Sequence, residues 1–364
     1  MTKGLFKGFL MGGFECSTHR DARGRRLDLI ASTRHDKFAS EDYSRLMDAG
    51  MLTARDGLRW HLIEREPGVY DFKSLERQVK AARETGIQII WDYFHYGYPD
   101  GLDIFGDEFT AGFAAFSREA TRYLVGELGP ELFICPVNEI SFFSWIAGDK
   151  GLFYPNKHGR AAELKRRLVK TAIASMDAVR EVCPSVRFIA TDPAIHVVPP
   201  KVSTPASRHG AENYRRAQFE AFDMLAQTGE KYFDILGLNY YFHNQWRHPS
   251  RRKIPPGHKE YKPLNRILLE YYERYRRPIF IAETGIEDDE RPTWFRYVFE
   301  QVEMARAEGV PVEGICLYPV VNHPGWADDR HCHNGLWDYA DDAGHREIYR
   351  PLADEISRQG KIVS

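Results

Sequence analysis

The chain has little of what marks a membrane, nucleic-acid-binding or disulfide-stapled protein. No apolar run approaches the ~20 residues of a membrane helix. The N-terminal segment has a lysine inside its short apolar stretch and no small-residue cleavage pattern, which argues against a signal peptide. The 50 basic and 52 acidic residues give a net charge of −2, so no overall attraction to nucleic acid or an anionic membrane is expected. Only five cysteines are present, an odd and scattered set, which favours free thiols and a cytoplasmic location.

What the 364 residues do contain is a regular alternation of short apolar runs with longer amphipathic runs. The apolar runs read as strands buried on both faces, as in a parallel sheet. The candidate strands span residues 8–15, 57–63, 87–95, 132–139, 186–192, 233–241, 279–284 and 314–321. Eight βα units in series predict a single (β/α)₈ TIM barrel domain over residues 1–364. A doubly wound open sheet is the rival, but MGGFECS after the first strand lacks its G-x-G-x-x-G loop.

Helices are predicted between these strands. One begins at Ser40 as its N-cap and runs to residue 47, and another ends at Gly86. The remaining helices are expected at about 109–128, 161–183, 212–229, 259–276, 292–308 and 346–358. Segments 141–160 and 243–263 are predicted to be long loops after the fourth and sixth strands.

Catalytic groups of such barrels stand at the carboxyl ends of the strands. Glu139 ends the fourth predicted strand and Glu283 lies near the end of the seventh. A glycosidase needs two such carboxylates, one to protonate the leaving oxygen and one to attack the anomeric carbon. Each glutamate alone could be an ordinary carboxylate in an ion pair. Together with Asn138 and the Tyr240–Tyr241 pair, they favour carbohydrate chemistry.

Several motifs in chain order support this interpretation. They are FLMGGFECS, LRW, YFHYGYPDGL, PVNEI, LGLNYY, FIAETG and LYPVVNHPGW followed by HNGLWD. The sequence thereby resembles glycoside hydrolase family 1, in the clan of retaining TIM-barrel glycosidases. The resemblance implies that Glu139 is the acid/base and Glu283 the nucleophile. It further implies that a β-linked sugar is hydrolysed by double displacement, without a metal or other cofactor.

The resemblance also implies roles for residues around the glutamates. Asn138 and His95 would bind sugar hydroxyls, Tyr241 would donate a hydrogen bond to Glu283, and Arg59 would hold Glu283 from below as a permanent cation. The remaining implied sugar contacts are the aromatic floor and wall, Tyr318 and Trp326, and the residue at the end of strand one, His19.

The sequence departs from the family pattern where the sugar is read. His19 replaces the usual glutamine, Gly325 the usual glutamate, and Tyr318 the usual tryptophan, while Ile140 follows the acid/base in place of proline. These departures predict a glycon other than plain glucose. A non-catalytic carbohydrate-binding barrel and a transglycosylase remain alternatives. The expected partner is a small-molecule carbohydrate, and the sequence does not predict an oligomeric state.

Three smaller groups of residues are predicted to have no catalytic or metal-binding role. His331, Cys332 and His333, with His323, lack an evident carboxylate partner, so no metal site is predicted. The basic run 251–253 is interpreted as a solvated loop. Cys16 has no evident adjacent base and is interpreted as a buried thiol.

Overall fold

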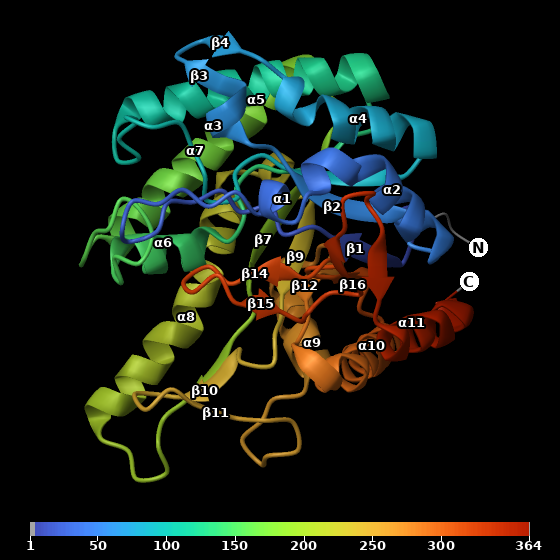
Figure 1. Ribbon diagram of the computed structural model, residues 1–364. Helices are drawn as coiled ribbons and strands as arrows, with labels where there is room; N and C mark the ends of the chain where they lie inside the picture. Colours follow the sequence, from blue (N-terminus) through green and yellow to red (C-terminus); the bar gives the residue numbers. More distant parts are fainter. Residues whose placement is uncertain (1–3, 364) are drawn as a thin grey trace.

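The computed structural model describes residues 4–363 and contains a closed barrel of parallel strands within that range (Figure 1). The barrel order is β1-β13-β12-β9-β7-β6-β5-β2, so the first strand pairs with both the second and the last. Its strands are β1 (Leu10–Gly13), β2 (Thr53–Gly57), β5 (Gln88–Asp92), β6 (Phe133–Cys135), β7 (Arg187–Pro193), β9 (Ile235–Asn239), β12 (Ile279–Thr284) and β13 (Val312–Leu317). The predicted (β/α)₈ barrel is therefore confirmed.

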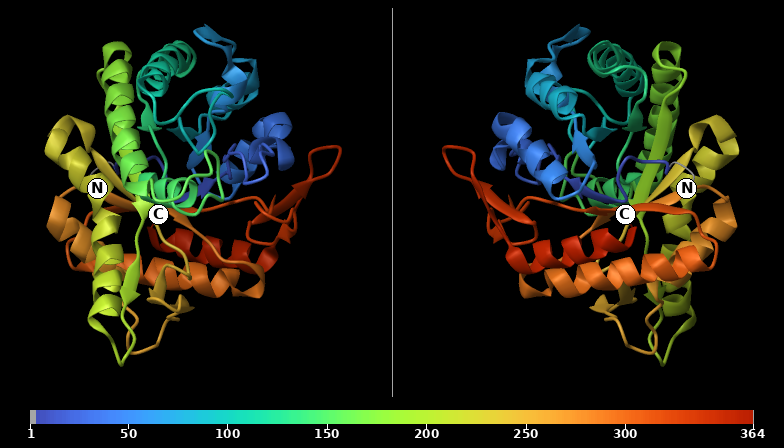
Figure 2. Two further views of the ribbon diagram at one scale, coloured as in Figure 1. Left: turned by 90° about the vertical axis from the view of Figure 1, so that its left-hand side faces the viewer. Right: turned by 90° about the vertical axis from the view of Figure 1, so that its right-hand side faces the viewer.

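Helices surround the barrel, and neighbouring ones such as α5 and α7, or α10 and α11, pack side by side (Figure 2). The helices are α1 (Leu29–Ser32), α2 (His35–Asp48), α3 (Trp60–Ile63), α4 (Lys73–Thr85), α5 (Asp107–Leu128), α6 (Ile140–Gly148), α7 (Ala161–Val182), α8 (Pro205–Thr228), α9 (Leu264–Tyr275), α10 (Arg291–Ala307) and α11 (Arg350–Val363), with 3₁₀ turns η1 (Glu230–Tyr232) and η2 (Asp288–Glu290). No helix within residues 4–363 is long and apolar enough to cross a membrane.

Short strands decorate the loops. They form the pairs β3 (Glu64–Glu66) with β4 (Val69–Tyr70), β14 (His323–Pro324) with β15 (His331–Cys332), and β16 (Trp337–Ala340) with β17 (Arg346–Ile348), and the sheet β8 (His196–Val198), β10 (Gln245–Arg247) and β11 (Arg252–Lys253). Two strands of the last sheet, β10 and β11, lie in the segment predicted as the long loop 243–263, where they form an antiparallel hairpin, and β10 pairs in parallel with β8.

The predicted position of the second strand is wrong. The apolar run 57–63 is not a strand, because it contains α3, whose Trp60 and Ile63 are buried. The real strand is β2, five fully buried residues, TARDG, that include an arginine and an aspartate. Charged residues can occupy a buried strand here because each finds a partner from elsewhere in the chain.

Two further local predictions are wrong. The segment 141–160 is not all loop, because α6 begins directly after Glu139. Ser40 is not an N-cap, because α2 begins at His35 and Ser40 lies inside it. The prediction for Gly86 is confirmed, since this glycine follows α4 with a φ of 72°.

A buried charge network ties α2 to the barrel and to the C-terminal part of the chain. His35 contacts Asp42 and Asp56 at 2.8 Å each, and Arg346 donates to Asp42 at 2.7 and 2.9 Å. Burial alone would lower the pKa of His35, but the two aspartates raise it to about 9. The network therefore holds a charged imidazolium where β2 and α2 meet.

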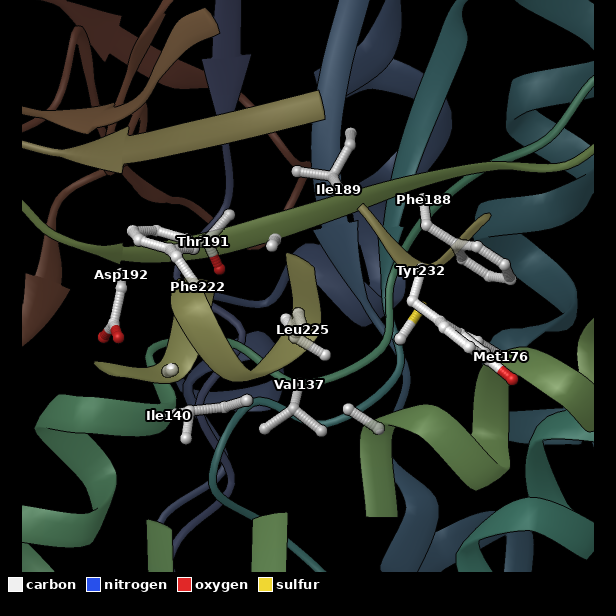
Figure 3. Close-up of a pocket in the computed structure, with 13 residues that line it drawn as sticks. Val137, Ile140, Met176, Phe188, Ile189, Thr191, Asp192, Phe222, Leu225 and Tyr232 are labelled. Atoms are coloured by element: carbon white, nitrogen blue, oxygen red, sulfur yellow. The ribbon is translucent and has the colours of Figure 1, made fainter. Parts of the chain in front are cut away.

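A small apolar cavity lies outside the barrel, lined by β7, α7 and α8 (Figure 3). Phe188, Met176 and Phe222 are among its lining residues, and its free volume of about 10 Å³ suits no more than one water molecule. Asp192 lies at its edge and accepts hydrogen bonds from the Ser141 backbone N–H at 3.1 and 3.2 Å. The cavity is a packing void and contains neither glutamate.

Candidate active site

Glu139 and Glu283 both stand at the carboxyl end of the barrel, Glu283 within β12 and Glu139 directly before α6. They are only 7% and 5% exposed. Glu139 has a left-handed backbone with φ 48°, and so has Tyr96, with φ 70°. Side chains other than glycine rarely adopt this conformation, and it concentrates at functional sites.

Glu283 is paired with a cation. Its Oε1 accepts from Arg55 Nη1 at 2.7 Å, and its Oε2 accepts from the Tyr241 hydroxyl at 2.8 Å. Burial raises the pKa of Glu283 above its ordinary value, and the charges of Arg55 and His95 and the Tyr241 hydrogen bond offset this rise only in part. The predicted hydrogen bond from Tyr241 is thus present.

Among the residues that the structure describes, Glu139 has only neutral donors. The Tyr96 hydroxyl donates to Oε2 and Asn239 Nδ2 donates to Oε1, the latter at 2.9 Å. Burial raises the pKa of Glu139 well above its ordinary value, and the negative charge of Glu283 raises it further. Of the two carboxyl groups, Glu139 is therefore the one that retains its proton to higher pH.

Arg55 is a fully buried residue of β2 that connects Glu283 to its neighbours. It donates to Asp92 Oδ1 at 3.1 Å, to Asn138 Oδ1 at 2.6 Å and to Glu283. Burial alone would lower the pKa of Arg55, but Asp92 and Glu283 raise it well above its usual range. A permanent cation with a planar fork of donors can hold several acceptors at once.

The prediction for Arg59 is wrong for this reason. Arg59 lies beyond the end of β2 and pairs with Asp28 at 3.2 Å and Asp36 at 3.6 Å, away from Glu283. The second strand was predicted over residues 57–63, four residues later than the start of β2, and this offset led to Arg59 in place of Arg55. Arg55 could have been found from its inward position once TARDG was recognised as the strand.

Asn138 and His95 meet beside Arg55. The amide oxygen of Asn138 also accepts from Thr191 at 2.7 Å, and its Nδ2 lies 3.2 Å from His95 Nε2. His95 Nδ1 is held by Asp92 Oδ2 at 2.9 Å. These contacts fix the orientation of both side chains.

A third carboxylate was missed. Glu15 is 7% exposed, its Oε1 accepts from the Ser17 backbone N–H at 3.0 Å, and the same oxygen lies 3.9 Å from His95 Nε2. It ends the first predicted strand, so the rule that active-site groups stand at strand ends would have found it.

Cys16, the next residue, does have an adjacent base, contrary to the prediction. Its Sγ lies 3.2 Å from His95 Nδ1 and 3.8 Å from the Tyr318 hydroxyl. Burial and the charge of Asp92 nevertheless raise the pKa of the thiol well above its ordinary value, which keeps it protonated. Tyr318 itself is buried, with its ring 5.4 Å from the Arg55 guanidinium carbon.

His19 and Trp326 belong to an aromatic group beside Tyr96. The His19 ring stacks on Phe153 at 3.7 Å and meets Trp326 edge-on at 5.3 Å. Both ring nitrogens of His19 and the indole nitrogen of Trp326 are buried without a hydrogen-bond partner in residues 4–363. Buried polar atoms are almost always paired, so such atoms indicate a polar ligand or water.

Asn239, beside Glu139, has an Oδ1 that is likewise unpaired in the described part of the chain.

His19 is neutral near pH 7, because burial and the positive charges of His95, Arg26 and Arg25 lower its pKa to about 3. A neutral imidazole offers one donor and one acceptor, which suits hydroxyl groups.

The histidine cluster of β15 does have a carboxylate partner. Asp338 Oδ1 lies 2.6 Å from His331 Nε2, and the ligand atoms of His331, His333 and Asp338 lie within 4.8 Å of one another. The prediction that these histidines lack a carboxylate partner is therefore wrong. Cys16, Asp92 and His95 form a second such group, but the Arg55 guanidinium within 2.8 Å of Asp92 opposes a cation there.

Known proteins resemble this chain over part of its sequence and over the whole of its fold. No protein-family model matches the chain. Among curated proteins, a β-galactosidase of Sulfolobus acidocaldarius is 32% identical over 102 residues, which cover 26% of this chain and 21% of that protein. The match thus spans about a fifth of the length of that relative.

Solved structures match over the whole chain. A β-glucosidase of Thermotoga maritima in complex with glucoimidazole superposes with a TM-score of 0.79 at 16% identity, covering 100% of this chain and 99% of that one. A family 1 β-glucosidase from the same organism gives a TM-score of 0.78 at 16% identity, with 100% and 98% covered. At this identity the likeness establishes the fold.

Proposed function

We propose that this chain is a retaining β-glycosidase, a single catalytic barrel domain that hydrolyses a β-linked sugar by double displacement. The observation that carries the proposal is the contrast between two buried carboxyl groups. Glu283 accepts a hydrogen bond from the Arg55 cation, whereas every hydrogen-bond donor to Glu139 within residues 4–363 is neutral. A nucleophile must be ionised and a general acid must be protonated, so the two carboxyl groups of a retaining glycosidase need different environments. The structural likeness to β-glucosidases adds support.

In the first step, an ionised Glu283 attacks the anomeric carbon while Glu139 gives its proton to the departing oxygen. The glycosidic bond breaks and a glycosyl ester forms on Glu283. Esterification removes the negative charge that raised the pKa of Glu139, so Glu139 can now lose its proton. In the second step, Glu139 takes a proton from water, the water oxygen attacks the anomeric carbon, and the ester bond breaks.

The surrounding residues prepare this chemistry. Arg55 and Tyr241 keep Glu283 ionised and aimed, because each donates to a different carboxylate oxygen. Asn138 and His95 would bind sugar hydroxyls, and such contacts to the 2-hydroxyl strengthen in the transition state. The unpaired nitrogens of His19 and Trp326 would bind hydroxyls of the same sugar, with Tyr318 at its floor.

The test is hydrolysis of aryl β-glycosides of the gluco, galacto, manno, fuco, xylo and glucurono series. The wild type is compared with Glu283→Gln and with Glu287→Gln, a matched control whose carboxylate pairs with Arg330 at the surface. We expect Glu283→Gln to lose several orders of magnitude and Glu287→Gln to remain active. NMR of the first product should show the β-anomer.

Two outcomes would contradict the proposal. An α-anomer as first product would refute retention. Sugar binding without turnover of any aryl glycoside or natural oligosaccharide would refute hydrolysis and favour a non-catalytic binding barrel.

A further inference from the structure

The two glutamates are each the starting point of a row of aromatic side chains that ends at a cation. The first row begins at Tyr96, which donates to Glu139, and continues to Phe142 at 5.8 Å between ring centres and to Trp145 at a further 6.1 Å. Arg251 lies over the Trp145 ring at 5.2 Å, and Lys150 lies over the same ring at 5.6 Å.

The second row begins at Tyr241, which donates to Glu283. Its ring stacks with His243 at 5.5 Å, and His243 contacts Phe242 at 5.1 Å. Lys253 lies over the Phe242 ring at 4.1 Å. Arg251 and Lys253 are two residues apart on the β10–β11 hairpin, so both rows end on the same short segment.

The charge of these cations is not offset by a neighbouring carboxylate in the described part of the chain. Elsewhere in the same region, Arg247 pairs with Glu260 and Lys262 with Glu270. Within residues 4–363, by contrast, Lys150, Arg251 and Lys253 form no ion pair with a carboxylate. All three are exposed, while Phe142, Trp145 and Phe242 beneath them are half-buried. Contact with a ring face holds a cationic head in place but leaves its charge available.

The first row connects the cations Arg251 and Lys150 to the proposed general acid. The first row leaves Glu139, the group that would protonate the departing oxygen, and reaches the start of the basic hairpin through α6. Phe142 also contacts Phe153 at 6.2 Å and Trp326 at 6.3 Å between ring centres, so the first row is continuous with the aromatic group of His19, Phe153 and Trp326. The rings nearest the general acid are those that a leaving group would pass, and flat ring faces suit either an aryl group or a sugar.

We propose that this hairpin selects the leaving group, and that the substrate is a β-glycoside whose aglycone carries a negatively charged group such as a carboxylate, sulfate or phosphate. The aglycone would stack on the aromatic rows and place its anion between Arg251, Lys253 and Lys150. The inference rests on the proposed glycosidase activity. It revises the interpretation of segment 251–253 as a merely solvated loop.

The experiment compares two substrates of nearly equal shape, the 4-carboxyphenyl β-glycoside and its methyl ester. Each is measured with the wild type, with Arg251→Gln/Lys253→Gln, and with Lys37→Gln/Lys361→Gln. The last variant removes the same charge from exposed positions on α2 and α11. We expect the hairpin variant to lower kcat/KM for the acid by about three- to tenfold, mainly through KM, as exposed charge pairs do. The ester should be unaffected.

Salt gives a second readout. The preference of the wild type for the acid should weaken between low salt and about 0.5 M salt, since exposed charges are then screened. Equal turnover of acid and ester by the wild type, or equal loss in the hairpin and control variants, would overturn the inference alone. If the wild type hydrolyses neither substrate, nor any other aryl β-glycoside, the proposed function itself fails.

Discussion

Replacing Arg55 and Arg59 in turn tests which of the two arginines supports Glu283, since the sequence predicted Arg59 and the structure shows Arg55. Replacing Arg55 by Gln removes the one cation that contacts both Asp92 and Glu283 in the described chain. A charge pair about 4 Å apart at an effective dielectric of about 20 is worth about 4 kcal/mol. Losing this interaction would raise the pKa of Glu283 further above its ordinary value. At neutral pH the ionised nucleophile would then fall by up to about a thousandfold.

Stability should fall as well. Breaking a buried ion pair by removing one partner costs about 3–5 kcal/mol, because the remaining carboxylates stay buried. Arg59→Gln is the matched control. Its partners Asp28 and Asp36 are 20% and 22% exposed, so the loss should be about 1 kcal/mol and the activity should be close to normal.

The assay is kcat/KM on the best aryl β-glycoside between pH 4 and 9, alongside urea unfolding of each variant. Arg55→Gln should shift the lower limb of the pH profile upward, and Arg55→Lys should restore part of the activity, because the charge is kept while the fork is lost. A folded Arg55→Gln variant with the wild-type pH profile would refute the assignment. So would an Arg59→Gln variant that loses as much activity.

Three further outcomes are expected. The pKa of His35 is about 9 in the folded protein against an ordinary 6.5, so its contribution of roughly 3 kcal/mol is complete below pH 6.5 and is lost as the pH rises through 9; unfolding free energies at pH 6 to 9.5 should show this loss, and His35→Gln should abolish it. Glu139→Gln should slow an alkyl β-glycoside by about 10²–10⁴ but slow formation of the glycosyl ester from a dinitrophenyl β-glycoside far less, because that leaving group needs no proton; equal losses in stopped-flow rates would contradict its role as acid. Gly97→Ala should lower Tm, since its Cβ would lie 1.7 Å from Thr18 Oγ1, whereas Gly112→Ala in α5, with nothing within 4 Å, should gain about 0.5–1 kcal/mol; similar melting curves would refute this reading of the packing.

The sequence was sufficient where local pattern decides structure. The run 279–284 is entirely apolar except at its end, so both the strand β12 and the position of Glu283 followed from it. The strand β2 could not be recognised in the same way. Arg55 and Asp56 look like surface residues until Glu283 and His35 are known to be their partners, and these contacts span 228 and 21 residues.

The site shows the same limit. Glu139 and Glu283 were found from the strand ends and their separate roles from the family resemblance. The donors that distinguish the two carboxyl groups are Tyr96 and Asn239 at Glu139 and Arg55 at Glu283. The first two were not proposed as site residues. Their function depends on the left-handed backbone at Tyr96 and on the register of β9 against β12, which pairs Asn239 with Glu283. Neither feature has a signature in a single sequence.

The closure of the barrel between β1 and β13 has a consequence for synthesis of the protein. During translation, β1 can pair with β2 early, but its other edge stays open until residues near Ile315 emerge. Arg346, which pairs with Asp42, is synthesised later still, because it lies 304 residues further along the chain. At about 5–20 residues per second this interval is about 15–60 s. The nascent N-terminal half therefore exposes an unpaired strand edge, and Asp42 lacks one of its cationic partners, for most of its time on the ribosome.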